Sequence, residues 1–269
     1  LTGIDLATVS APVQLKEIPL ASQLYTQLQA LAQPDARRLL SNINRGIEKE
    51  SLRINAQGKL AQTPHPAGLG SALTHSSITT DYSEALLEFI TPVSASIEQS
   101  LQQLEDIHSY VYQKLDEEIL WSASMPCILA GDAGIPVARY GSSNIARMKT
   151  VYRYGLGHRY GRLMQTIAGI HYNFSMPQAY WDKAWQDAGS PGELQDYIST
   201  RYLGLIRNFR RYSWLLIYLY GASPAVCSSF LKGRDNHGLQ SFDGEAGSLY
   251  MPYGTALRMG RLGYNSDAQ

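Results

Sequence analysis

Alternation of apolar and polar residues predicts strands in two parts of the chain. Over residues 42–55, isoleucine and leucine side chains are separated by charged ones, and the Asn-Ala-Gln-Gly sequence at residues 55–58 predicts a turn. Residues 171–176 alternate as well and are followed by Pro177. We therefore expect one strand at each place.

A third apolar run, at residues 85–91, allows two interpretations. The run stops at Pro92, and its length and composition favour a strand. The alternative is a helix that begins at Asp81, because Glu84 stands at the spacing of a capping box. Residues 61–80 are rich in Pro, Gly, Ser and Thr and are expected to form a loop.

Helical periodicity predicts two long helices and a short one. Residues 96–118 carry apolar side chains on one face, with Ser96 at the cap position. His108 falls within this apolar stripe and is expected to be a hydrogen-bonded core residue. A second helix is predicted over residues 190–220, opened by a serine cap with proline in the first turn, and a short one at residues 21–32.

Long helices and separated strands without a βαβ pattern favour an α+β fold with an antiparallel sheet. No internal repeat, low-complexity segment or clear linker divides the chain. We expect residues 1–40 to be a weakly specified lead-in and residues 41–269 to belong to a single domain.

Composition excludes several classes of protein. The 269 residues are 44% hydrophobic and 17% charged, which is enough for a sizeable core and argues against disorder. Lys and Arg number 23 and balance 23 Asp and Glu, so neither nucleic acid nor a membrane surface is an expected partner. The apolar run at residues 214–220 is too short to span a membrane, and two cysteines without a visible signal peptide fit a reducing compartment. A cytoplasmic location is expected.

The balanced charge conceals two unlike halves. Residues 1–120 carry 8 Lys and Arg against 14 Asp and Glu, whereas residues 121–269 carry 15 against 9. If the acidic half faces the basic half, the two could bind metal ions and a polyanion at the same site. An internal, salt-bridged interface is the alternative.

Several acidic residues are candidates for a cation site. Glu48 and Glu50 stand two residues apart on a predicted strand, so both project from one face, where like charges repel unless a cation holds them. A solvated sheet edge is the alternative for this pair. Glu88 lies within the apolar run ALLEFITP and needs an arginine or a metal ion, because an unpaired buried carboxylate is costly. Glu84 is expected to be an exposed charge or a cap, and His171 either a metal ligand or a core residue.

The tract from residue 139 to residue 175 contains no Asp or Glu. Its Gly, Arg, Lys and Tyr residues fit contacts with phosphates, made by backbone N–H groups and guanidinium groups. The tract contains neither of the glycine motifs of the common nucleotide sites. RNA binding is the alternative for interleaved Arg and Tyr, and the neutral net charge disfavours it.

Five runs together carry a family resemblance: RGIEKESLRI, GSALTHSSITTDYSEALLEFITP, MKTVYRYGLGHRYGRLMQTIAGIHYNFSMP, YLYGASPAVCSSFL and YGTALRMGRLGY. They closely resemble the proteobacterial type of glutamate–cysteine ligase, from about residue 42 to the end of the chain. The resemblance implies a glutamine synthetase-like fold, in which an antiparallel sheet forms a funnel with helices packed outside. It also implies ATP-dependent ligation of the L-glutamate γ-carboxylate to the L-cysteine amine through γ-glutamyl phosphate, the first step of glutathione biosynthesis.

The resemblance assigns roles to individual residues, with Mg²⁺ (or Mn²⁺) as cofactor and ATP as co-substrate. Arg153 falls in the phosphate region as a catalytic and ATP-binding residue. The positions that match the family's metal ligands are Glu48, Glu50, Asp81, Glu88 and His171. The positions that match its cysteine pocket are Tyr82, Tyr152, Leu156, Gln165, Arg258 and Tyr264.

Two features of the chain depart from the family. Tyr82 stands where Phe is expected and Lys49 where Arg is expected, and neither change removes a ligand. Members of the family also continue well beyond the position of residue 269, so we expect this chain to be the amino-terminal part of the enzyme. Its site is then expected to be incomplete, or to be completed by a second chain. A related ligase with another acceptor amine and a non-catalytic fragment that binds metal or substrate are the alternatives.

Overall fold

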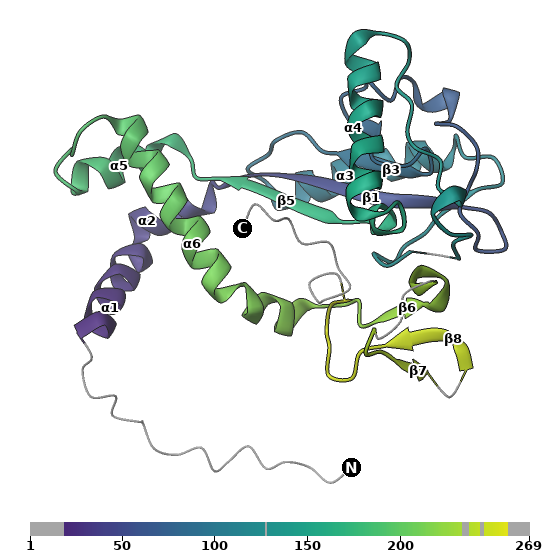
Figure 1. The fold of residues 1–269 in the computed structure, drawn as a ribbon. Coiled ribbons are helices and arrows are strands. Elements are labelled where there is room, and N and C mark those ends of the chain that lie inside the picture. The colour runs from purple at the N-terminus through teal and green to yellow at the C-terminus, as the bar shows by residue number, and fades with distance from the viewer. Residues whose placement is uncertain (1–18, 127, 233–236, 243–244, 258–269) are drawn as a thin grey trace.

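A computed structural model describes residues 19–126, 128–232, 237–242 and 245–257 (Figure 1). Its helices are α1 (Pro19–Ala32), α2 (Pro34–Ser41), α3 (Ile97–Tyr112), α4 (Asn144–Tyr160), α5 (Gln178–Asp187) and α6 (Leu194–Tyr220). Its strands are β1 (Asn44–Ile54), β2 (Ile78–Thr80), β3 (Leu86–Ile90), β4 (Ile119–Leu120), β5 (Ile170–Ser175), β6 (Ala225–Cys227), β7 (Gln240–Phe242) and β8 (Glu245–Tyr250).

β1 is the central strand of the main sheet, and β3 and β5 pair with its two edges. β2 extends the sheet beyond β3, and β4 pairs with the end of β1. All of these pairings are antiparallel, as expected for an α+β fold. A smaller antiparallel sheet of β6, β8 and β7 lies beyond the end of α6 (Figure 1).

The strands predicted at residues 42–55, 85–91 and 171–176 are confirmed as β1, β3 and β5. The alternative helix from Asp81 is wrong, because the N–H of Asp81 donates to the carbonyl of Leu86 at 2.9 Å in the turn between β2 and β3. The loop predicted over residues 61–80 contains β2, whose three residues are too few to show a period.

One face of the sheet packs against α3. Apolar residues of the strands and of α3 form a buried cluster that includes Phe89 and Val111. Ser96 caps the helix as predicted, since its side chain accepts a hydrogen bond from the N–H of Gln99 at 3.1 Å. His108 is hydrogen-bonded as expected but is only half-buried, with Nδ1 2.8 Å from the carbonyl of Leu104 and its ring edge-on to Phe89.

Other helix boundaries differ from the predictions. α3 ends at Tyr112 rather than near residue 118, and α6 begins at Leu194 rather than at residue 190. Ser190 does not cap α6, because it lies four residues before the first helical residue with a positive φ of 52°. α2, which packs against α5, lies in the expected lead-in, and α2, α4 and α5 were not predicted.

The other face of the main sheet contributes Leu52 and Leu86 to the largest buried cluster, which also contains Tyr82. Side chains of the small sheet and of its connections, including Val226 and Phe230, complete that cluster. None of the helices in the described part of the chain combines the length and apolar content of a membrane span.

Candidate functional site

The register of the main sheet brings four predicted metal ligands onto one face. Glu48 and Glu50 lie two residues apart on β1, so their side chains project from the same side of the sheet. Glu88 on β3 pairs directly with Glu50, and His171 on β5 pairs directly with Glu48. Directly opposed residues of antiparallel strands share a face. We call these four residues the acidic face.

Asp81 reaches the acidic face from the end of β2. Thr79 pairs with Glu88, and Asp81 lies two residues further along. Oδ1 of Asp81 is 3.4 Å from Nη2 of Arg153, and the backbone carbonyl of Asp81 accepts a hydrogen bond from Nε of Arg153. The Arg153 guanidinium also lies 4.7 Å from the ring centroid of Tyr140, whose hydroxyl donates to the same carbonyl at 2.7 Å. Arg153 is therefore fixed at the rim of the acidic face.

Positive charge compensates the carboxylates of this face only in part. Burial and then the negative charge of Asp81 raise the pKa of Glu50 to about 7. A backbone hydrogen bond and His171 offset this rise only in part. Burial and the charges of Asp81 and Glu48 likewise raise the pKa of Glu88. The site therefore favours additional positive charge, from a proton or a cation.

Hydrogen bonds orient two of these carboxylates. Oε2 of Glu50 accepts from the N–H of Gly169 at 2.6 Å. Oε2 of Glu48 is 3.1 Å from Nδ1 of His171, and its Oε1 accepts from Nδ2 of Asn173 at 2.9 Å. Burial lowers the pKa of His171, but the hydrogen bond to Glu48 and the surrounding carboxylates outweigh burial and raise it. Sequence reasoning missed Gly169 and Asn173, although Asn173 stands two residues after His171 and so shares its face.

The donor chemistry of the acidic face fits a hard divalent cation, since such ions bind carboxylate oxygens and some also bind imidazole. The carboxylate and imidazole groups of this face lie further apart than the ligands of a single metal ion do. Within the described ranges, no group of three or more His, Cys, Asp or Glu side chains is placed to hold one ion. Glu48 faces His171 and Asn173 instead, and Asp81 faces Arg153.

The residues predicted for the cysteine pocket differ in their surroundings. Tyr82 is 1% exposed in the largest buried cluster, and Leu156 of α4 packs against the same cluster. Gln165 is half-buried in a short 3₁₀ helix. Tyr152, one helical turn before Leu156, is 64% exposed. Outside the described part of the chain lie Arg258 and Tyr264.

The basic tract forms a helix over part of its length, so backbone N–H contacts with phosphates stay a prediction for residues outside that helix, such as Gly141. α4 takes up residues 144–160, so the N–H groups of its interior are used within the helix. Gly157 has a different role, because a Cβ at this position would lie 2.3 Å from the hydroxyl of Tyr82. Phosphate contacts from α4 would therefore come from side chains such as Arg153.

Glu84 is neither an exposed charge nor a helix cap, contrary to both expectations. It is 8% exposed, and its two carboxylate oxygens accept from the N–H groups of His65 and Arg139, each at 2.8 Å. Glu84 therefore ties two loops together.

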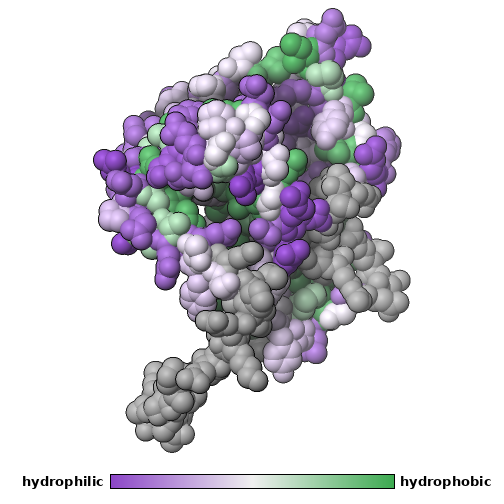
Figure 2. All heavy atoms as spheres, turned by 90° about the vertical axis from the view of Figure 1, so that its left-hand side faces the viewer, coloured by the Kyte–Doolittle hydropathy of each residue, from purple (hydrophilic) through white to green (hydrophobic). Residues whose placement is uncertain are grey.

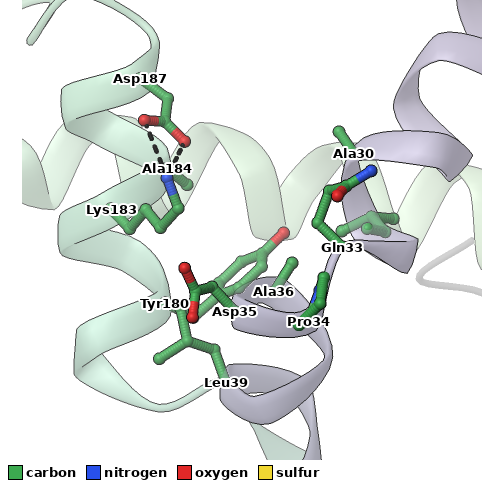
Figure 3. A pocket seen from close by; sticks show the side chains of 11 residues that line it. Ala30, Gln33, Pro34, Asp35, Ala36, Leu39, Tyr180, Lys183, Ala184 and Asp187 are labelled. Atoms are coloured by element: carbon green, nitrogen blue, oxygen red, sulfur yellow. Dashed lines mark hydrogen bonds and ion pairs between the residues drawn. The ribbon is translucent and has the colours of Figure 1, made fainter.

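One pocket borders the acidic face, and another lies away from it. A pocket of about 280 Å³ borders the acidic face and is lined in part by Glu48 and Asn173. Another, between α2 and α5, contains none of the predicted site residues (Figure 3). There Lys183 is paired with Asp187 at 2.8 Å, and Tyr180 lies between the two helices (Figure 3).

Comparison with known proteins decides the family. A family model described as "Glutamate-cysteine ligase" matches residues 28–269. The chain belongs to the glutamate–cysteine ligase family. Glutamate–cysteine ligases of Alcanivorax borkumensis and Saccharophagus degradans are 61% and 62% identical to it, over 91% and 86% of the chain. The chain covers 46% and 43% of those two proteins, and so spans about half the length of these relatives.

Solved structures confirm the fold of the glutamate–cysteine ligase family in this chain. The glutamate–cysteine ligase of Francisella tularensis, solved in complex with AMP, is 39% identical with a TM-score of 0.75. That match covers 85% of this chain and 44% of the other. A bifunctional glutathione synthetase from Pasteurella multocida is 32% identical with a TM-score of 0.66, over 75% of this chain and 26% of the other.

Proposed function

We propose that this chain takes part in the ATP-dependent joining of the L-glutamate γ-carboxylate to the amine of L-cysteine, the first step of glutathione biosynthesis. A carboxylate is a poor acyl donor, so ATP first converts it to γ-glutamyl phosphate, which the amine then attacks. The observation that carries the proposal is the acidic face with Arg153 at its rim, in a chain of the glutamate–cysteine ligase family.

A divalent cation, Mg²⁺ or Mn²⁺, is the proposed cofactor. The residues that would hold it are Glu48, Glu50, Asp81, Glu88 and His171. When bound, such an ion neutralises phosphate oxygens and aligns the phosphoryl donor with its acceptor. The raised pKa values of Glu50 and Glu88 support this assignment, because repulsion between carboxylates is what a cation relieves. Glu48 and Asp81 would exchange their present partners for the ion.

Arg153 is proposed to bind the phosphoryl group that passes from ATP to glutamate. Its side chain is 11% exposed and is held by Asp81, by the ring of Tyr140 and by the carbonyl of Lys149, to which Nη1 donates at 3.1 Å. A guanidinium fixed in this way loses little further freedom when it binds phosphate oxygens, and its planar fork suits two of them. It would stabilise the charge of the phosphoryl group in transfer.

The acceptor amine is proposed to lie beside α4. Tyr82 and Leu156 supply a buried apolar wall, which would help to exclude water from the acyl phosphate. The other proposed pocket residues are Tyr152, Gln165, Arg258 and Tyr264, with Arg258 as the partner of the cysteine carboxylate.

Two further points belong to the proposal. The chain spans about half the length of these relatives, and the remainder of the site is proposed to come from a segment equivalent to the rest of their length. The proposed substrates, ATP and free amino acids, are consistent with a cytoplasmic reaction.

Cysteine-dependent formation of ADP tests the proposal. ADP release by the longest protein that the gene encodes should require ATP, Mg²⁺, L-glutamate and L-cysteine together. Replacement of L-cysteine by 2-aminobutyrate or alanine separates this enzyme from a ligase that uses another acceptor. Absence of cysteine-dependent release with all four present would contradict the proposal. Calorimetry with Mg²⁺ and with glutamate would then show whether the chain only binds.

A further inference from the structure

Two side chains of β5 hold the carboxylate of Glu48 between them. His171 and Asn173 stand two residues apart, so the strand presents both on the side of the acidic face. Nδ1 of His171 lies 3.1 Å from Oε2 of Glu48, and Nδ2 of Asn173 donates to Oε1 of Glu48 at 2.9 Å. The proposed function makes Glu48 and His171 metal ligands and leaves Asn173 without a role.

Asn173 reaches Glu48 diagonally across the pair of strands. The register places Asn173 opposite Gly46, while Glu48 lies opposite His171. Diagonal neighbours on one face of a sheet are close enough for side chains of this length to meet. Gly46 has no side chain, and the space beside it belongs to the 280 Å³ pocket that Glu48 and Asn173 also line. The glycine therefore leaves room for the amide of Asn173 to turn toward Glu48.

The amide of Asn173 suits a lasting hydrogen bond to Glu48. An ionised carboxylate only accepts hydrogen bonds, so the nitrogen of the amide must face it. The amide does not change its charge near neutral pH, whereas the donor and acceptor roles of the His171 ring depend on its protons. The bond from Asn173 occupies one acceptor position of Oε1 and leaves the others of the carboxylate available. Asn173 can therefore hold Glu48 while Glu48 binds a cation.

Exposure alone does not account for this arrangement. Every residue of β5 is exposed, and hydrophilic residues cover much of the surface that Figure 2 shows, so a polar side chain on β5 is ordinary in itself. Ser175, the next residue on the same face, is also exposed, but its side chain makes no hydrogen bond to a carboxylate among the described residues. Asn173 differs because its partner belongs to the acidic face. Loss of a hydrogen bond that orients a metal ligand typically weakens metal binding by about 10–100-fold.

We propose that Asn173 is a positioning residue for the divalent cation. Its amide holds the Glu48 carboxylate in the orientation in which Glu48 binds the ion, and Asn173 itself does not contact the ion. A carboxylate that is already oriented loses less conformational freedom on binding, so the hydrogen bond raises the affinity of the site for the cation. The role of Glu48 as a metal ligand, on which this inference rests, comes from the proposed function.

Binding of Mn²⁺ to the longest protein that the gene encodes tests this role. Calorimetry with Mn²⁺ alone, without nucleotide or amino acids, gives the dissociation constant. Asn173→Ala should raise that constant about 10-fold and leave the melting temperature of the metal-free protein unchanged, because the side chain is exposed. Ser175→Ala removes a polar side chain from the same strand and face and should change neither value. In the ADP assay, Asn173→Ala should raise the Mg²⁺ concentration for half-maximal turnover about 10-fold and keep kcat at saturating Mg²⁺ within about 3-fold of wild type.

Four results would overturn the positioning role: a wild-type protein that binds no Mn²⁺, an unchanged dissociation constant in Asn173→Ala, an equal increase in Ser175→Ala, or a lower melting temperature of metal-free Asn173→Ala. The last would indicate a structural role instead. Unchanged Mn²⁺ binding together with a fall in kcat that saturating Mg²⁺ does not restore would place Asn173 in contact with a substrate. Weaker Mn²⁺ binding by Asn173→Ala, in a protein that shows no cysteine-dependent ADP release, would contradict the proposed function and leave the positioning role standing.

Discussion

Strand register gives neighbouring carboxylates opposite roles. Glu84 precedes β3, and each of its carboxylate oxygens accepts a hydrogen bond from a backbone N–H group. The donors, His65 and Arg139, lie 19 and 55 residues away in the sequence. Glu88 lies within β3, opposite Glu50, and burial together with the charges of Asp81 and Glu48 raises its pKa. The protein itself supplies the hydrogen bonds of Glu84, whereas Glu88 still favours added positive charge, from a proton or a cation.

Substitution of Glu50 by Gln should separate turnover from stability. Because the pKa of Glu50 is raised to about 7, the folded state binds its proton more tightly than the unfolded state does. The unfolding free energy of the wild type should therefore fall as pH rises from about 4.5 to 7, and Gln should remove this part of the fall. Turnover of the enzyme should drop roughly 100-fold or more if Glu50 holds the cation.

Chemical denaturation at pH 5 and at pH 8 measures the effect on the unfolding free energy, and the ADP assay measures the effect on turnover. Glu105→Gln, on the exposed surface of α3, is the control for loss of one charge. Unchanged turnover in Glu50→Gln would remove Glu50 from the metal ligands.

Gly157→Ala should destabilise the chain although alanine favours a helix. The new Cβ would lie 2.3 Å from the Tyr82 hydroxyl, which is buried and has no hydrogen-bond partner among the described residues. We expect a loss of about 1–3 kcal/mol in unfolding free energy, and recovery when Tyr82→Phe is combined with it. At Gly155 a Cβ would meet no described atom within 4 Å apart from the adjoining residues and the backbone of its own helix, so Gly155→Ala should instead stabilise by about 0.5–1 kcal/mol. If the changes in unfolding free energy of Gly157→Ala and Tyr82→Phe simply added in the double mutant, the proposed steric clash between Gly157→Ala and the Tyr82 hydroxyl would be contradicted.

Helices and strands of this chain differ in whether one of their faces is buried, and this difference decided which of them the sequence pattern predicted. α3 has a cap, a buried stripe and a strand partner, whereas α6 is longer and buries nothing. The periodicity of α3 indicated its position correctly because packing on the sheet requires that stripe. α4 escaped prediction because only Ala146 among its residues is buried, so its sequence carries no helical stripe. β2 and β4, with three residues or fewer, are too short for a period to show.

The two predicted serine caps make a matched test at the scale of the helix. Ser96→Ala removes the acceptor of the Gln99 N–H and should lower the unfolding free energy by about 1 kcal/mol. Ser190→Ala should have an effect close to zero, because Ser190 caps no helix in the structure. Thermal and urea unfolding measure both. An equal loss in the two variants would contradict the assigned start of α6.

The candidate site is assembled from parts far apart in the chain. Glu48 meets His171 across 123 positions, and Arg153 meets Asp81 across 72. Residue chemistry indicated Glu48, Glu50, Glu88 and His171 as candidates, and the family resemblance assigned the roles of Asp81 and Arg153. The pairing of Glu48 with His171 and Asn173 depends on the register of β5 against β1, which no local pattern in the sequence contains. Among the described residues, the same register leaves the outer edge of β5 without a partner strand.

Hydrogen exchange should reveal this uneven coverage across the molecule. Amides of β1 and β3 lie in the buried part of the sheet and should exchange most slowly. Amides of α6 should exchange at least about 100-fold faster than those of α3, because little packing opposes local opening of α6. Similar protection of α3 and α6 would contradict this difference in coverage.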